Sequence, residues 1–203
     1  MDALNQILGA VLMTFLHSVL PALPIAIVIV GISLLWRKKK GMKISPWHTA
    51  GLILFIAYLY CVFNLTLGYL PDMITHLIRS PEDYVLIEKR LNLIPIVEMI
   101  NFALYPNPNI HHSQFVFNVG GNIVMFMPFG FFLPLLWKRW STMKRTVFVG
   151  LCTSVCIEFI QYWIGGTTDI DDVITNVAGV FLGFLCFLLF RKLLPKTTAK
   201  IQG

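Results

Sequence analysis

Glu158 is the residue with the clearest chemical potential, because it is a carboxylic acid inside an apolar stretch of the chain. A charged side chain at the centre of a bilayer costs roughly 2.5–3.5 kcal/mol on insertion scales, so it needs a partner, a water-filled cavity or a proton. Gln161 lies three residues further on and shares its helix face. We therefore predict a functional role for Glu158, in binding a polar ligand or as a general acid or base. The alternative is that a protonated Glu158 only forms a hydrogen bond to a neighbouring helix.

Two other apolar stretches begin with groups of amide and acidic side chains. Asn118 and Asn122 stand four residues apart at the start of one stretch, so they point the same way from a helix. The start of the other stretch carries Asp169, Asp171, Asp172 and Asn176. Amides can hold neighbouring helices together, and acidic residues at a helix N-terminus can act as caps. Capping accounts for one or two of the aspartates and leaves the others for another role.

We predict that these polar residues form one pocket at the outer membrane interface. Its predicted binding residues are Asn118, Asn122, Glu158, Gln161, Asp169, Asp171, Asp172 and Asn176. Carboxylate oxygens suit hard cations, so a divalent cation at Asp169, Asp171 and Asp172 is compatible with the sequence, although no cofactor is predicted. The amides would suit a polar head group. The single candidate for catalysis is Glu158, and we favour a protein that is not an enzyme.

Long apolar segments must position these residues. The chain has 203 residues, of which 57% are hydrophobic and 13% charged, whereas a soluble domain carries roughly 25% charged residues. Because one span needs ~20 apolar residues, we predict an all-α fold, a polytopic transmembrane helical bundle of about five spans. The predicted spans are residues 8–36, 47–70, 115–137, 146–164 and 173–194.

Three smaller features refine this prediction. The apolar runs within residues 71–116 are too short and too interrupted to span, so we expect an interfacial or re-entrant segment there. Gly179 and Gly183 form a GxxxG pattern, which allows close helix packing within the bundle or, as the weaker alternative, in a homodimer. The four cysteines lie in apolar segments, where we expect small buried residues.

The distribution of charge predicts the orientation. Thirteen of the sixteen Lys and Arg residues lie in residues 37–43, 138–145 and 191–200, and none of these segments contains an acidic residue. Basic residues mark cytoplasmic segments, and alternation of the spans places all three on one side. We therefore predict an outside N-terminus, an inside C-terminus and an acidic outer surface. The basic runs abut apolar segments without a nucleic-acid-binding motif, so we expect no nucleic-acid partner.

Four segments resemble, in the same order, signatures of the VanZ-like family of bacterial membrane proteins. They are Arg90-Leu91-Asn92-Leu93-Ile94-Pro95, NVGGNIVMFMPFGFFLP from Asn118, Ile157-Glu158-Phe159-Ile160-Gln161, and Asp169-Ile170-Asp171-Asp172-Val173 followed by Asn176 and Gly179. The resemblance covers residues 60–190, adds Asn92 to the predicted binding residues and implies a multi-pass protein of the bacterial cell membrane. Many members carry an arginine just before the acidic signature, where this chain has Gly165-Gly166-Thr167-Thr168.

The resemblance also implies a function, since the founding member of the family is associated with resistance to the lipoglycopeptide teicoplanin. We predict a VanZ-like membrane protein that lowers sensitivity to such drugs through its outer polar site. One alternative is a membrane enzyme acting on a lipid or cell-wall precursor, with Glu158 as acid or base and a metal at Asp171 and Asp172. Another is a small transporter subunit. The expected partners are the lipid bilayer and either a lipoglycopeptide or a lipid-linked cell-wall precursor, and a homodimer is left open.

The predicted organisation has three parts. Residues 1–45 form an N-terminal transmembrane segment with a basic cytoplasmic loop, and residues 46–194 form the VanZ-like transmembrane domain. Residues 195–203 form a cytoplasmic tail.

Overall fold

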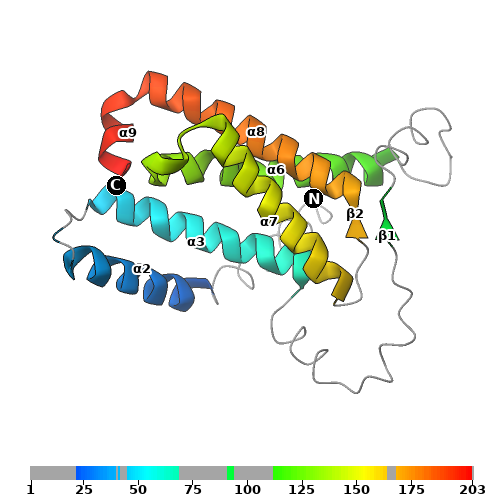
Figure 1. Cartoon of the computed structure of the whole chain (residues 1–203), viewed down its shortest axis with the longest axis horizontal. Coiled ribbons are helices and arrows are strands. Elements are labelled where there is room, and N and C mark those ends of the chain that lie inside the picture. Colours follow the sequence, from blue (N-terminus) through cyan, green and yellow to red (C-terminus); the bar gives the residue numbers. More distant parts are fainter. Residues whose placement is uncertain are drawn as a thin grey trace, which may run out of the picture.

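The structure is a computed structural model that describes residues 22–39, 41, 45–68, 91–93, 112–163 and 168–202 (Figure 1). Its helices are α2 (Ala22–Lys39), α3 (Pro46–Leu67), α6 (His112–Leu136), α7 (Met143–Trp163), α8 (Ile170–Leu193) and α9 (Pro195–Ile201). The short 3-10 helix η2 (Lys138–Trp140) links α6 to α7. Two strands of two residues each, β1 (Leu91–Asn92) and β2 (Thr168–Asp169), pair in parallel. The predicted all-α fold is confirmed.

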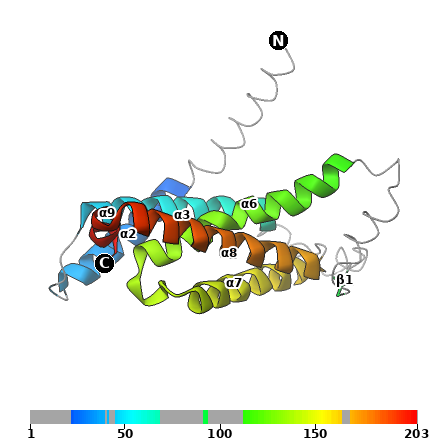
Figure 2. The ribbon, with the colours of Figure 1, turned by 90° about the horizontal axis from the view of Figure 1, so that it is seen from above.

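Four of the described helices are long and apolar enough to cross a membrane. They are α3, the Asn118–Leu136 part of α6, α7 and α8, and they correspond to four of the five predicted spans. The fifth prediction, residues 8–36, falls partly outside the described residues, and α2 covers its described end. In Figures 1 and 2 these helices run roughly along the long axis of the molecule, and α2 lies beside α3. Most of the predicted interfacial or re-entrant segment, 71–116, lies outside the described residues.

The helix ends follow from local sequence. Ser45 caps α3 by accepting a hydrogen bond from the His48 backbone N–H, and Pro46 supplies the first residue of the helix. Gly68 ends α3 with a φ of 82°, a conformation that favours glycine. Asp169 caps α8, because its carboxylate accepts from the backbone N–H of Asp171 at 2.9 Å. One of the three clustered aspartates therefore has a capping role.

The most extensive contact between helices joins α6 and α8, and glycines make it possible. A Cβ atom added to Gly130 would collide with the backbone carbonyl of Val180, and one added to Gly183 would collide with that of Met127. Gly179 lies in the same way against Ile123. The GxxxG pattern of α8 thus packs against α6 within the chain. Without side chains in between, the two backbones approach closely and polar groups on them can meet.

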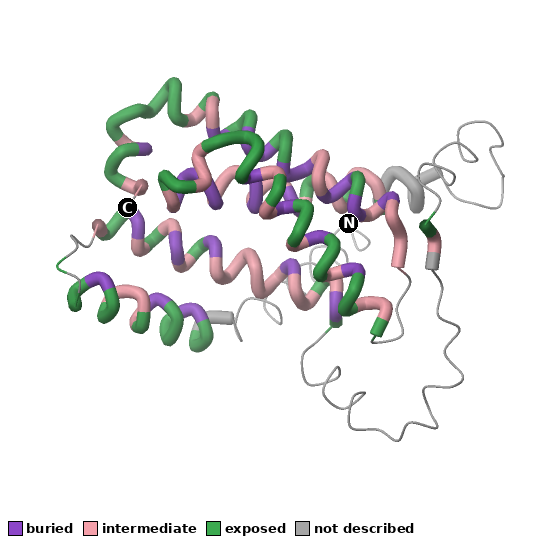
Figure 3. The backbone as a smooth tube through the Cα atoms, viewed as in Figure 1, coloured by how far each residue is buried: buried purple, intermediate pink, exposed green. Residues whose placement is uncertain are grey.

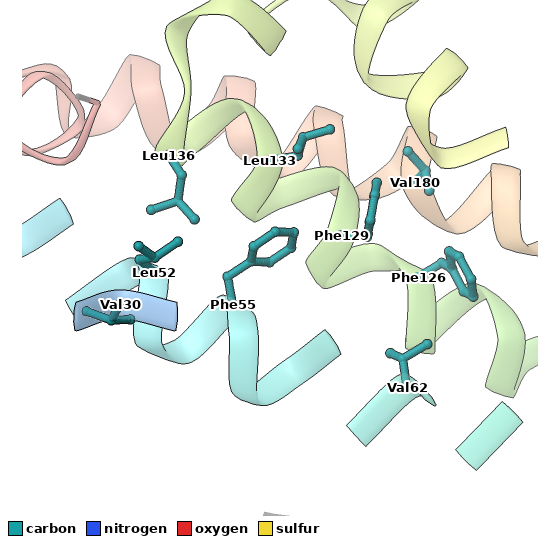
Figure 4. Packing of buried hydrophobic residues seen from close by; sticks show 9 residues of the cluster. All are labelled: Val30, Leu52, Phe55, Val62, Phe126, Phe129, Leu133, Leu136 and Val180. Carbon is teal, nitrogen blue, oxygen red and sulfur yellow. The ribbon is translucent and has the colours of Figure 1, made fainter. Parts of the chain in front are cut away.

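The largest apolar cluster of the described residues joins α2, α3, α6 and α8 (Figure 4). The Phe55 ring on α3 packs against Phe129 and Trp137, with ring centroids 5.9 and 5.8 Å apart. Val180 is fully buried, and its methyl groups fill the space that a side chain at Gly150 would need. The core therefore extends to the fourth candidate span, α7, where Val180 of α8 packs against Gly150.

The surface of α7 has the reverse of the soluble-protein pattern. Its buried face consists of residues four apart that are small or polar, namely Thr146, Gly150, Ser154 and Glu158. Its exposed face carries Phe148, Leu151, Val155 and Phe159, and Figure 3 shows the alternation along the helix. This arrangement is typical of helices that pack through small residues and turn large apolar ones to lipid. Our expectation of buried cysteines was wrong for Cys152, Cys156 and Cys186, which are exposed on such faces.

At one end of the bundle, α9 folds back onto the start of α3. Ser45 Oγ donates to the Lys200 carbonyl at 2.6 Å, and His48 Nδ1 lies 2.8 Å from the Ile201 carbonyl. Gln202 Nε2 donates to the Pro134 carbonyl at the end of α6, at 2.9 Å. These contacts gather the basic end of α8, the α6–α7 connection and the start of α3 at one end, as a shared cytoplasmic side requires. The orientation itself stays a prediction.

We predict that Gly183→Ala destabilises the fold by about 1–3 kcal/mol, the usual cost of overpacking a tight contact. The new methyl group would meet the Met127 backbone, which cannot move aside as a flexible side chain could. The free energy of unfolding, measured by SDS titration in mixed micelles, checks this. Gly120→Ala is the matched control on α6, because nothing lies within 4 Å of its added Cβ. Equal effects of the two substitutions would contradict the proposed α6–α8 contact.

We also predict that Lys144 faces the cytoplasm and residue 167 the exterior. In a variant whose native cysteines are alanine, a membrane-impermeant maleimide should label Thr167→Cys in intact cells. Lys144→Cys should be labelled only after the membrane is permeabilised. The reverse labelling pattern would mean that the basic segments lie outside, against the charge distribution.

Candidate functional site

A cavity of about 620 Å³ lies between α3, α6, α7 and α8, within the size range of small-molecule sites. Its polar lining residues include six that the sequence predicted, Asn118, Asn122, Glu158, Gln161, Asp172 and Asn176. Apolar side chains such as Val62, Leu65, Val124 and Met125 form the rest of the wall. The cavity thus combines carboxylates and amides with a hydrocarbon surface. It lies toward the end of the bundle opposite α9, where α3 and α7 finish and α8 begins.

Asn122 and Asp172 connect α6 to α8 across the cavity wall. The Asn122 side-chain Nδ2 donates to Asp172 Oδ1 at 2.7 Å, a short distance typical of a hydrogen bond to a charged acceptor. The close approach of the two backbones at Gly179 and Ile123 brings these side chains within reach. This hydrogen bond therefore depends on the glycine packing.

Glu158 is buried and held by the residues that precede α8. Its Oε2 accepts from the Asp169 backbone N–H at 3.0 Å, and its own carbonyl accepts from Thr168 Oγ1 at 3.1 Å. Strand β2 thus fixes the end of α7 through both the side chain and the main chain of one residue. Glu158 thus has the hydrogen-bond partner that a carboxylic acid inside an apolar span needs.

Gln161 faces the cavity one turn beyond Glu158. Its Nε2 donates to the Thr66 carbonyl near the end of α3, at 2.9 Å. That hydrogen bond determines which end of the amide is the oxygen. Gln161 Oε1 is buried and has no hydrogen-bond partner within the described ranges. The site therefore holds an acceptor ready for a donor.

Asn176 repeats this arrangement deeper in the bundle. Its Nδ2 donates to Ser154 Oγ on α7 at 2.9 Å, and the residue is only 3% exposed. Its Oδ1 is buried and likewise lacks a hydrogen-bond partner among the residues that the structure covers. An unsatisfied buried acceptor costs ~1–3 kcal/mol. A buried acceptor of this kind calls for a donor, which a ligand or an ordered water can supply.

The remaining predicted site residues do not line this cavity. Asn92 on β1 donates from Nδ2 to both carboxylate oxygens of Asp169, each at 3.3 Å, and the two residues pair in the strand register. Asp171 is buried at the start of α8. Asp169 and Glu158 border a second groove of about 350 Å³, which is lined mainly by apolar side chains such as Phe159 and Val173. Asn92 and Asp169 therefore hold Glu158 in place and do not form the cavity wall.

The proposed metal ligands do not converge. Asp169 is engaged by the start of its own helix and by Asn92, whereas Asp172 receives the amide of Asn122. In the described ranges, no group of three His, Cys, Asp or Glu side chains could hold a metal ion. The three aspartates thus fit a set of helix-end and interhelical contacts better than a shared cation.

Sequence reasoning missed residues that complete the site through main-chain groups or short hydroxyls. The Tyr58 hydroxyl donates to the Met125 carbonyl at 2.7 Å and so anchors α3 to α6 beside the cavity. Thr66 and Ser154 receive the two amides described above. A tyrosine hydroxyl in an apolar span signals a need for a partner, but nothing local identifies Thr66 or Ser154.

Comparison with known proteins supports one family. The profile of the VanZ/LLP1 family matches residues 55–191. Protein VanZ from Enterococcus faecium is 40% identical over 72 residues, which make up 35% of this chain and 44% of that relative, so the match spans less than half of the relative's length. No solved structure matches. Because the profile covers more than half of the chain and the spans agree, this chain belongs to the VanZ/LLP1 family and is a multi-pass protein of the bacterial membrane.

Proposed function

We propose that this protein lowers the sensitivity of the cell to teicoplanin-type lipoglycopeptides. It does so by binding the drug in the cavity between α3, α6, α7 and α8. The observation that carries the proposal is the composition of this cavity, whose lining combines Glu158, Asp172 and Asn176 with apolar side chains. A lipoglycopeptide presents both a lipid tail and a polar body. A site with both kinds of surface suits such a molecule better than it suits a small polar solute.

The position of the cavity favours a ligand that resides in the membrane. Leu65 on α3 and Val124 on α6 line the cavity and are 64% and 65% exposed. On spanning helices, apolar side chains with this exposure face lipid. A molecule anchored in the outer leaflet can therefore reach the polar groups from the side. Binding there would draw the drug away from its target or disturb its anchoring.

A binding role is favoured over catalysis because the carboxylates already serve as hydrogen-bond acceptors. Glu158 accepts the Asp169 backbone N–H and Asp172 accepts the Asn122 amide. In the part of the chain that is described, the cavity lining contains no histidine to activate Cys61, its one cysteine. Nucleophilic catalysis needs such a base within hydrogen-bond reach.

We expect expression of this protein in a susceptible Gram-positive host to raise the teicoplanin concentration needed for inhibition, with a smaller effect on vancomycin. Glu158→Gln and Asp172→Asn should lower protection toward the empty vector. Each keeps an acceptor oxygen for its structural hydrogen bond but removes the charge, and losing one charged contact weakens binding about tenfold or more. The inhibitory concentrations, measured at matched membrane levels, check this expectation.

Thr153→Val is the matched control for these variants. Thr153 lies on α7 near Glu158, donates only to the Val149 carbonyl and does not line the cavity. It should protect as the wild type does. If no strain differs from the empty vector, drug tolerance is not the function of this protein. If both charge-removing variants protect fully, the cavity is not the site.

A further inference from the structure

Two buried oxygen atoms of the cavity lining receive no hydrogen bond from any described residue. Asn176 Oδ1 and Gln161 Oε1 both lack a hydrogen-bond partner among the described residues, and both side chains line the cavity. The Gln161 amide nitrogen donates to the Thr66 carbonyl, which can only accept, so Oε1 is the end left for a ligand. The Asn176 amide nitrogen donates to Ser154 Oγ. Asn176 is only 3% exposed, so bulk water does not satisfy its amide oxygen. The missing partner is a hydrogen-bond donor.

Within the described lining, every hydroxyl and amide side chain except Asn118 already donates one hydrogen bond to another residue. The Tyr58 hydroxyl donates to the Met125 carbonyl at 2.7 Å, and Thr66 Oγ1 donates to the Val62 carbonyl at 2.8 Å. Asn122 Nδ2 donates to Asp172. Asn118, the remaining amide of the lining, is exposed at the cavity edge. The interior of the cavity therefore offers acceptors and few donors.

The charge of the lining also favours a ligand that brings donors and positive charge. Glu158 and Asp172 contribute two carboxyl groups, and no Lys, Arg or His belongs to the described lining. A phosphate or carboxylate brings only acceptors and negative charge, so it would meet neither requirement. A primary ammonium group brings one positive charge, three donors and no acceptor. Ca²⁺ would need six to eight oxygen ligands, and the described residues contain no suitable metal-holding group.

The mouth of the cavity limits the rest of the ligand. Leu65 and Val124 frame the cavity on α3 and α6 while about two thirds of each residue surface is exposed. Val62 and Met125 continue this apolar wall inward. A hydrocarbon chain can lie along Leu65 and Val124 without leaving the lipid. The ligand therefore has an alkyl chain outside the bundle and its donor group inside.

We propose that this cavity binds the primary ammonium head of a membrane lipid, with Asn176 Oδ1 and Gln161 Oε1 as acceptors. The carboxyl groups of Glu158 and Asp172 supply the opposing charge, and the lipid chains remain at the Leu65–Val124 mouth. This inference shares one premise with the proposed function, namely that this cavity is the functional site. It names the resident ligand class, against which a lipid-tailed drug would compete.

The test measures lipid retention by the purified full-length protein, using native mass spectrometry. The probes are phosphatidylethanolamine, phosphatidylcholine and phosphatidylglycerol with identical dioleoyl chains. The first two share the phosphate and a positive charge, but only phosphatidylethanolamine carries N–H donors. We expect phosphatidylethanolamine adducts to exceed both others by about tenfold, as one well-made charged hydrogen bond allows. Equal retention of phosphatidylethanolamine and phosphatidylcholine, or a preference for phosphatidylglycerol, would overturn the proposal.

Two substitutions locate the preference within the cavity. Asn176→Leu and Gln161→Leu should each reduce phosphatidylethanolamine adducts toward the phosphatidylcholine level, whereas Thr153→Val should leave them unchanged. Asn176→Asp retains an acceptor oxygen, and the Ser154 hydroxyl can then donate to it, so this variant should keep the preference even if Asn176→Leu fails to fold. A preference that survives in both leucine variants, or that disappears in Asn176→Asp, would refute the assignment. No drug is present, so this result is independent of the susceptibility assay.

Discussion

The close backbone contact between α6 and α8 is the constraint on which the rest of the structure depends. Gly130 and Gly183 allow each helix to touch the carbonyl groups of the other, at Val180 and Met127. In lipid there is no hydrophobic force between helices, so van der Waals contact and hydrogen bonds must hold them together. The same approach brings Asn122 to Asp172. The glycine packing therefore also positions the polar contact.

From this pair of helices the structure divides into two chemically different ends. One end joins the α9 region to the start of α3 and to the end of α6 through the carbonyl acceptors of Lys200 and Pro134. The other end holds carboxyl and amide groups. There β2 anchors Glu158, and the oxygens of Gln161 and Asn176 have no donor among the described residues. Polar groups at this depth are costly unless a partner, water or a proton satisfies them, so their presence points to a functional site. The proposed function and the proposed lipid head both follow from that expense.

Much of the fold could be predicted from the sequence, because a spanning helix leaves an apolar run of recognisable length. The predicted spans differ from α3, α7 and α8 by only a few residues at each end, as expected where caps such as Ser45 and Asp169 decide the boundary. The sequence also predicted a group of polar residues near one depth, and six of its nine members line one cavity. Whether that cavity binds a ligand stays a prediction. The partners Thr66 and Ser154 could not be predicted, because they depend on which helices touch.

The most direct test of this account is a double-mutant cycle on Asn122→Ala and Asp172→Ala, read as the free energy of unfolding in mixed micelles. We expect a coupling of about 0.6 kcal/mol, the average for hydrogen bonds between membrane helices, and at most about 1.7 kcal/mol. The loss from Asn122→Ala should therefore be smaller when Asp172 is already alanine. Additive losses, with coupling within about 0.3 kcal/mol of zero, would mean that α6 and α8 do not meet at this point. That result would contradict both the packing of the two helices and the cavity built on it.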